Sequence, residues 1–225
     1  TEGEEGVARS LDPDDNATFC DAVDPYGDGD LGTPGAANPS CPVQLEPGQC
    51  LDGDMARDIV GPTVGDLVIT EFIPNPDNVS DGNGEWIEFH ALGSFDLNDL
   101  ELGEQGEVEF TYDGISECQP VNPGDTILMA RNGDPDSNGG LPEVDITYGT
   151  AISLTNGGDD FFLGYDGVVV DTVMFTGSSE GAARSLDPNA YDPVDNDDEA
   201  NFCDATLAYN ADDFGTPGEQ NPACN

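Results

Sequence analysis

The stretch Leu67-Val68-Ile69-Thr70-Glu71-Phe72-Ile73, followed at once by Pro74-Asn75-Pro76, decides the fold class. β-Branched and aromatic residues in a short run that ends at a proline turn are typical of a β-strand. No segment of the chain repeats its apolar residues with the 3.6-residue period of an amphipathic helix. Five further runs of strand character follow the first one, at residues 85–89, 108–112, 126–130, 160–163 and 168–175. Short strands at this spacing predict an all-β, immunoglobulin-like β-sandwich with long acidic loops rich in glycine and proline.

The segments on either side of this strand region repeat one another. The first copy begins Glu5-Gly6-Val7-Ala8-Arg9-Ser10-Leu11-Asp12-Pro13, and the second begins Glu180-Gly181-Ala182-Ala183-Arg184-Ser185-Leu186-Asp187-Pro188. Both copies continue with Phe-Cys-Asp-Ala, Gly-Thr-Pro-Gly and Asn-Pro-x-Cys, the second after an eight-residue insertion. A match of this length indicates a duplicated structural unit.

The repeat predicts the domain organisation. Residues 1–42 correspond to the C-terminal part of one unit, residues 43–65 to a linker, and residues 66–225 to a complete β-sandwich. Residues 1–41 hold too few apolar side chains to fold alone, so we expect them to borrow a core. The chain is then either a piece of a tandem array, or it donates this segment to a neighbouring chain in a head-to-tail polymer.

The six cysteines are expected to form disulfides in an oxidising compartment. Cys20 and Cys41 are 21 residues apart, as are Cys203 and Cys224, so equal spacing within the repeats predicts these two pairs. Cys50 and Cys118 then pair by elimination. Each 21-residue loop stabilises the fold by roughly 3 kcal/mol in the chain-entropy account. Buried free thiols are the alternative.

Several of these segments resemble lamin tail domains of bacterial secreted proteins. The resemblance rests on residues 68–76 and 84–89, on 154–159 and 167–171, and on 184–186 and 215–218. It covers about residues 66–220, and residues 5–39 resemble the end of a second such domain. The resemblance implies an immunoglobulin-like sandwich without catalytic residues, used as an accessory or structural module of exported proteins. The filament role of nuclear lamins depends on a coiled coil that this sequence lacks.

The charge of the chain excludes several function classes. It carries 48 Asp and Glu against four Arg and no Lys, giving a formal net charge of −44. Nucleic acids and anionic membrane surfaces would repel it, and no apolar run is long enough for membrane insertion. A compact fold at this charge density needs counterions, and Asp outnumbers Glu by 32 to 16. Because Asp is common in calcium loops, we expect calcium as a cofactor.

Two loops carry the pattern expected of calcium ligands. Asp134, Asp136 and Asn138 precede Gly139, with Asp145 at the twelfth position, close to the spacing of an EF-hand loop but without flanking helices. The other candidate ligands lie in a Gly- and Asn-rich loop: Asp77, Asp81, Asn83 and Glu85. A polar hairpin loop is the alternative for the first, and an Asn-Gly turn that satisfies its own backbone is the alternative for the second.

Two arginines at the same repeat position, Arg9 and Arg184, are expected to anchor structural ion pairs. No enzymatic activity is expected. The Gly177–Gly181 match to G-x-S-x-G lacks a strand–turn–helix context, and Glu71, Glu85 and Glu88 have no spacing that favours a glycosidase pair.

The sequence therefore predicts a secreted, extracellular or bacterial cell-surface structural module that could serve as a filament subunit through exchange of terminal segments. It would self-associate or contact neighbouring lamin-tail-like modules, without nucleic-acid partners. The alternatives are a calcium-dependent adhesion or glycan-binding module that stacks sugars on Trp86, Tyr112 or Tyr148, and an accessory domain of a larger secreted hydrolase.

Overall fold

The structure is a computed structural model that describes residues 5–14 and 17–224. The chain divides into two compact units, Thr1–Arg57 and Asp58–Asn225, and each is described here by itself. Strands dominate both units, so the chain is all-β. Among the described residues, no helix is long and apolar enough to cross a membrane.

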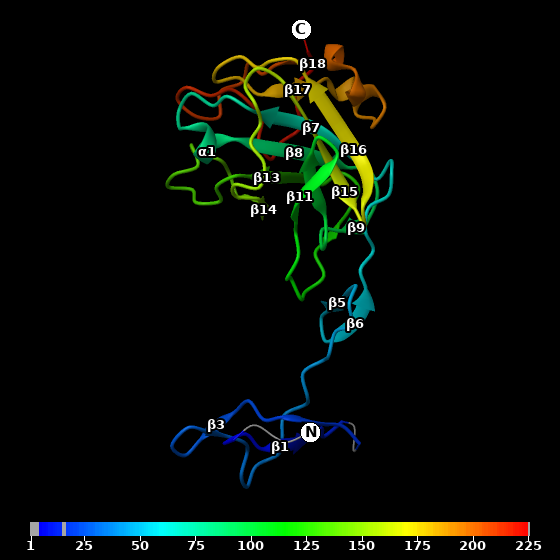
Figure 1. Cartoon of the computed structure of the whole chain (residues 1–225), viewed down its shortest axis with the longest axis vertical. Coiled ribbons are helices and arrows are strands. Elements are labelled where there is room, and N and C mark those ends of the chain that lie inside the picture. Colours follow the sequence, from blue (N-terminus) through cyan, green and yellow to red (C-terminus); the bar gives the residue numbers. More distant parts are fainter. Residues whose placement is uncertain (1–4, 15–16, 225) are drawn as a thin grey trace. The chain divides into compact units, whose positions relative to one another are not determined.

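The second unit contains two main sheets (Figure 1). The larger has six strands in the order β14-β13-β8-β7-β17-β18. These are β14 (Ile146–Thr147), β13 (Thr126–Ala130), β8 (Trp86–Ala91), β7 (Leu67–Ile73), β17 (Arg184–Leu186) and β18 (Phe202–Asp204). The four strands of the smaller sheet, in spatial order, are β11 (Glu107–Thr111), β10 (Glu101–Glu104), β15 (Asp159–Tyr165) and β16 (Val168–Phe175). The late strand β17 thus returns to pair with the early strand β7.

Side chains from both sheets meet in one hydrophobic core, which makes this unit a β-sandwich. Phe72 of β7 lies at its centre, with ring centroids 5.2 Å from Phe161, 5.0 Å from Phe175 and 5.7 Å from Phe202. A smaller apolar cluster around Trp86 and Leu128 covers the opposite face of the larger sheet. All seven residues of β7 are therefore buried, which explains why its sequence is apolar on both faces.

Short elements connect the strands of the second unit. A small ladder pairs β12 (Pro120–Val121) with β9 (Phe95–Asp96). The helical turns are α1 (Asp81–Gly84), η1 (Pro188–Ala190), η2 (Asp195–Asp197) and η3 (Glu199–Asn201). The last two lie in the eight-residue insertion and its flank.

The first unit is built from three two-stranded ladders. They pair β1 (Arg9–Leu11) with β2 (Phe19–Asp21), β3 (Pro25–Tyr26) with β4 (Asp30–Leu31), and β5 (Gln49–Asp52) with β6 (Met55–Asp58). The last hairpin lies inside the stretch 43–65 that the sequence suggests as a linker.

The six strands predicted from the sequence between residues 67 and 175 are all present, with ends shifted by a few residues. The sequence did not indicate β10, because Glu101-Leu102-Gly103-Glu104 contains one large apolar residue. Gly103 is required there, since a Cβ would lie 2.2 Å from the carbonyl oxygen of Glu107. This tight approach coincides with the register shift between β10 and β11.

Candidate functional site

Two buried glutamates on neighbouring strands form the centre of the candidate site. Glu71 of β7 and Glu88 of β8 face each other in the antiparallel register, and their side chains are 0% and 1% exposed. A β-bulge between Ile69 and Glu71 shifts the register just before this pair. Carboxylates are rarely buried unless hydrogen bonds compensate them, so their partners determine what the site does.

The C-terminal segment supplies most of these hydrogen bonds. Glu71 accepts hydrogen bonds from Ser185 Oγ, from Thr216 N at 2.9 Å and from Thr216 Oγ1 at 3.0 Å. Glu88 accepts one from Gly218 N at 2.7 Å and one from Thr70 Oγ1 at 3.0 Å. The Thr216-Pro217-Gly218 turn is thereby fastened to two strands of the larger sheet through their carboxylates.

Burial dominates the electrostatics of this pair. Desolvation raises the pKa of Glu71 to about 7, against the opposing hydrogen bonds from Ser185 and Thr216. Desolvation, and then repulsion from Glu71, raise the pKa of Glu88 well above its ordinary value. The pair therefore binds protons at a pH where exposed carboxylates are ionised.

Asn221 completes the attachment of the segment. Its Nδ2 donates to the carbonyl oxygen of Thr70 at 2.9 Å and to that of Leu186 at 3.1 Å. Its Oδ1 lies 2.9 Å from Thr216 Oγ1, whose one proton also faces Glu71, and its backbone N–H donates to Tyr191 Oη at 3.2 Å. One buried asparagine thus joins β7, β17 and the terminal turn. We call residues 180–224 the second copy of the closing element.

The first unit contains the same local structure in residues 5–14 and 17–41, which we call the first copy of the closing element. Thr33 Oγ1 donates to Asn38 Oδ1 at 2.7 Å, and Asn38 Nδ2 donates to the carbonyl oxygen of Leu11 at 3.0 Å. Strand registers match as well: Arg9 pairs with Asp21 and Ser10 with Cys20, as Arg184 pairs with Asp204 and Ser185 with Cys203. The repeat is therefore structural as well as sequential.

Each copy contains one disulfide and one ion pair. Cys20 bonds to Cys41 and Cys203 to Cys224, the two pairs that equal spacing predicts. Cys50 and Cys118 are also disulfide-bonded, so no cysteine of the chain is free. Arg9 lies 2.8 Å from Asp21, and Arg184 lies 2.9 Å from Asp204. Each arginine also donates to a backbone carbonyl of the adjacent strand.

The two disulfides are expected to differ in their effect on stability. The double substitution Cys203→Ser/Cys224→Ser should lower the free energy of unfolding of the second unit by about 3 kcal/mol, because a 21-residue loop is opened. The matched change Cys20→Ser/Cys41→Ser should leave that transition unchanged, because its loop lies in the first unit. Trp86, the single tryptophan and fully buried in the second unit, reports the transition by fluorescence in urea. Equal losses in both variants would contradict this assignment.

The two loops predicted to bind calcium lie next to each other. Asn78 Nδ2 donates to the carbonyl oxygen of Gly139 at 3.2 Å, and Asn132 Nδ2 donates to Asn83 Oδ1 at 3.2 Å. Asn210 Nδ2 also reaches the Gly139 carbonyl, at 2.7 Å. A third loop, which the sequence did not single out, therefore joins the two predicted ones.

In the first of these loops the side chains of Asp134, Asn138 and Asp145 already accept hydrogen bonds. Asp134 accepts from the backbone N–H of Asp136 at 3.1 Å and from Ser137 Oγ at 3.0 Å. Asn138 Oδ1 accepts from two backbone N–H groups, while Asp145 Oδ2 accepts from Leu128 N at 2.8 Å. The Asp145 carboxylate is thus a partner of β13.

In the other predicted loop, Asp81 and Asn83 lie in the single turn α1, and Asp77 donates its backbone N–H to the buried Asp213 at 2.6 Å. Glu85 is fully buried and forms an ion pair with Arg131 at 3.2 Å. Desolvation raises the pKa of Glu85 to about 7, even beside the arginine. Its oxygens also accept from Ser153 Oγ and Leu154 N, so Glu85 joins the loop to the strand region.

Among residues 5–14 and 17–224, no three His, Cys, Asp or Glu side chains are grouped so that they could hold a metal ion. Asp77, Asp81, Asn83 and Glu85 share one loop, and Asp134, Asp136 and Asn138 share another. These two loops remain the places where backbone and amide oxygens could add to carboxylates around a cation.

A further buried carboxylate, which the sequence did not indicate, joins the two sheets of the sandwich. Asp171 of β16 accepts from Ile69 N of β7 at 2.7 Å and from Asn196 Nδ2 at 2.8 Å. Asn196 belongs to the eight-residue insertion. It is the single buried residue within 192–199. Desolvation raises the pKa of Asp171 to about 7. The acidic insertion thus has a structural role, because its Asn196 side-chain amide holds Asp171.

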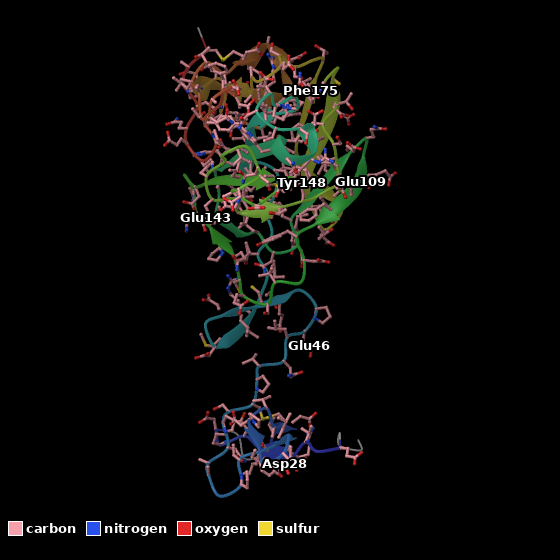
Figure 2. The ribbon with its side chains drawn as sticks, turned by 90° about the vertical axis from the view of Figure 1, so that its left-hand side faces the viewer. Asp28, Glu46, Glu109, Glu143, Tyr148 and Phe175 are labelled. Atoms are coloured by element: carbon pink, nitrogen blue, oxygen red, sulfur yellow. A yellow bond between two sulfur atoms is a disulfide. The ribbon has the colours of Figure 1, made fainter. Side chains whose placement is uncertain are left out.

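Two of the aromatic side chains considered for sugar stacking are inside the second unit. Trp86 is 0% exposed and Tyr148 is 3% exposed, and Tyr112 packs, partly buried, against the core. Figure 2 shows Tyr148 and Phe175 within the fold, whereas the acidic Glu109 and Glu143 lie at its surface. The two buried rings are core residues and offer no face to a ligand.

Comparisons with known proteins gave no match: neither the protein-family models, nor the curated proteins, nor the solved structures include one.

Proposed function

We propose that this chain is a non-catalytic structural module of an extracellular assembly, built on an immunoglobulin-like sandwich of the lamin-tail type. The observation that carries the proposal is the duplicated closing element. In the second unit it completes a sandwich by pairing with β7. In the first unit the same element is folded, but β1 pairs only with β2 among the described residues.

Other features support a structural role outside the cell. Three disulfides fit an oxidising environment. The polar groups of the candidate site hold strands and turns together, and both Glu71 and Glu88 accept a hydrogen bond from a backbone N–H of the closing element. A net charge of −44 favours an environment rich in divalent cations. We assign calcium to residues 77–83 and 134–138 as the cation that offsets it, leaving out Glu85 and Asp145, which are held by Arg131 and by Leu128 N.

Light scattering and electron microscopy of the 225-residue chain under oxidising conditions test this function. We expect ordered oligomers that grow with protein concentration in millimolar calcium and dissociate in excess chelator. Magnesium at equal concentration is the matched control for general charge screening. Monomers at high protein concentration in calcium would overturn the assembly role, and turnover of any substrate at the Glu71–Glu88 pair would overturn the non-catalytic assignment.

A further inference from the structure

We propose that the first copy of the closing element docks onto the β7–β8 hairpin of another module of this fold, and that it recognises paired carboxylates at the positions of Glu71 and Glu88. This inference rests on the proposed function and names the surface through which modules join. The partner is thus a sandwich whose own closing element is absent or displaced.

Unused hydrogen-bond donors carry the first part of the argument. Ser185 Oγ, Thr216 N and Gly218 N hold the two glutamates in the second unit. Their counterparts in the first copy are Ser10 Oγ, Thr33 N and Gly35 N, and in the described part of the chain none of the three makes a hydrogen bond, although Ser10 itself is only 4% exposed. Two of these groups can only donate, so an acceptor fits between them.

The turn that presents these donors is already formed in the first copy. The N–H of Ala36 bonds to the Thr33 carbonyl at 3.0 Å, as the N–H of Glu219 bonds to the Thr216 carbonyl at 2.8 Å. Gly35 has φ +79° and its counterpart Gly218 has φ +81°, a backbone conformation that L side chains rarely adopt. The donors are thus fixed in place before a partner binds, which lowers the entropy cost of docking.

The second part of the argument is the edge of β1 that has no strand partner among the described residues. In the second unit, β17 pairs with β18 on one edge and with β7 on the other, where Arg184 lies opposite Phe72 and Ser185 opposite Glu71. In the first unit β1 has its β18-like partner β2, and its other edge has no strand among the described residues. A free edge with a matching register is the surface that β-strand addition uses.

The third part of the argument is the exposed apolar surface of the first copy. Phe202 is 7% exposed and contacts the Phe72 ring, whereas its counterpart Phe19 is 52% exposed. Ala183 is fully buried, whereas its counterpart Ala8 is exposed. Phe19 and Ala8 are thus uncovered where their counterparts pack beside β7, and they fit an apolar strand with an aromatic residue at the Phe72 position, whereas Ser10 is only 4% exposed.

The hairpin of this chain is not available as that partner. Its β7 is already paired on both edges, with β8 and with β17, and Glu71 and Glu88 already hold Thr216 and Gly218. The first copy therefore needs a hairpin from another module. The contact is one-sided, since this chain contributes its first copy while its own hairpin stays closed by its second copy.

A tandem chain tests the inference. Residues 43–179 are placed directly before Glu5 of the full chain, so that the first copy follows a hairpin in the same order as the second copy does. The added segment carries Asp171→Asn, because the shorter first copy has no counterpart of Asn196. Hydrogen exchange of the β1 amides is then compared between the tandem chain and the 225-residue chain. We expect exchange of these amides to slow by about 100-fold or more, toward the rate of β17, as for a strand gaining a ladder partner.

Two controls define the recognition. Glu71→Ala with Glu88→Ala, made only in the added segment, and Thr33→Val with Ser10→Ala, made only in the first copy, should each restore faster exchange of β1. A second tandem chain, with residues 180–224 in place of 5–41 after the added segment, shows that the added segment can fold.

The inference is overturned if β1 exchanges equally fast in the tandem and 225-residue chains. It is also overturned if the added segment folds with residues 180–224 but not with residues 5–41. Calcium-dependent oligomers of the natural chain that persist alongside either result would leave the assembly role intact and place the contact on another surface.

Discussion

Substitution of Phe202 by alanine is expected to destabilise the protein by about 3–5 kcal/mol, whereas the same change at Phe19 should cost less than about 0.5 kcal/mol. The two residues occupy equivalent positions of the repeat, each beside a disulfide-bonded cysteine and opposite the leucine of the neighbouring strand. The contrast therefore isolates the effect of packing against β7.

The physical reason is the aromatic cluster of the second unit. Phe202 is 7% exposed and its ring lies 5.7 Å from that of Phe72, which also contacts Phe161 and Phe175. Removing one ring leaves a cavity that a closely packed core fills only in part. Phe19 is 52% exposed, so its removal opens no comparable cavity.

Calorimetry of the whole chain under oxidising conditions measures both effects, because it registers the transitions of both units. A loss at Phe19 as large as at Phe202 would show that the first copy already has a core partner within this chain. In the tandem chain, by contrast, Phe19→Ala should become destabilising, since the added hairpin covers that ring.

Much of this architecture follows from residue patterns. β-Branched and aromatic runs bounded by proline and glycine predicted six strands correctly, because burial on both faces makes a strand such as β7 strongly apolar, while β16 shows the alternation of a strand with one face exposed. The repeat predicted two disulfides, because equal loop lengths constrain the pairing. The order of strands across the two sheets could not be predicted from local residue patterns. The pairing of β17 with β7, for example, joins Ser185 and Glu71, which are 114 residues apart in the sequence.

The candidate site was less accessible from sequence. No spacing in the sequence singled out Glu71 and Glu88 as a pair, and the segment that covers them is remote in sequence. The signal that could have found them is the repeated Gly-Thr-Pro-Gly, whose threonine and second glycine donate to the two carboxylates. Asn196 carried no signal, because the surrounding carboxylates made its loop look uniformly solvated.

The stability of the second unit should fall as the pH rises from about 5 to about 8. Burial raises the pKa of Glu71, Glu85 and Asp171 to about 7, and that of Glu88 well above its ordinary value. A carboxyl whose pKa is higher in the folded protein stabilises it fully below the unfolded pKa, and this contribution is lost as the pH rises through the folded pKa. The rise for Glu71 alone corresponds to roughly 3 kcal/mol.

A limit at lower pH follows from groups shifted the other way. Hydrogen bonds from Asn189 lower the pKa of Asp187, those from Thr176 lower the pKa of Glu199, and the Ser179 and Arg184 contacts lower that of Asp204. Their stabilising contribution is present above the unfolded pKa and is lost as the pH falls through the folded value. We therefore expect maximal stability at about pH 4–5, below the usual range for proteins.

Glu88→Gln tests this origin of the pH dependence without disturbing the packing. The glutamine carbonyl can still accept from Gly218 N, and its amide can donate to Thr70 Oγ1, so both contacts of the glutamate persist. Urea unfolding followed by Trp86 fluorescence should show this variant about 1–3 kcal/mol more stable than the wild type at pH 8, and equally stable at pH 4. Glu109→Gln, on the exposed strand β11, is the matched control and should change stability by less than about 0.5 kcal/mol.

If Glu88→Gln is instead destabilising at pH 8, the Glu88 carboxylate is held ionised by a cation or donor at this site. The closing element would then be fastened to the sheet by charge, and its docking onto a second module would strengthen as the pH rises.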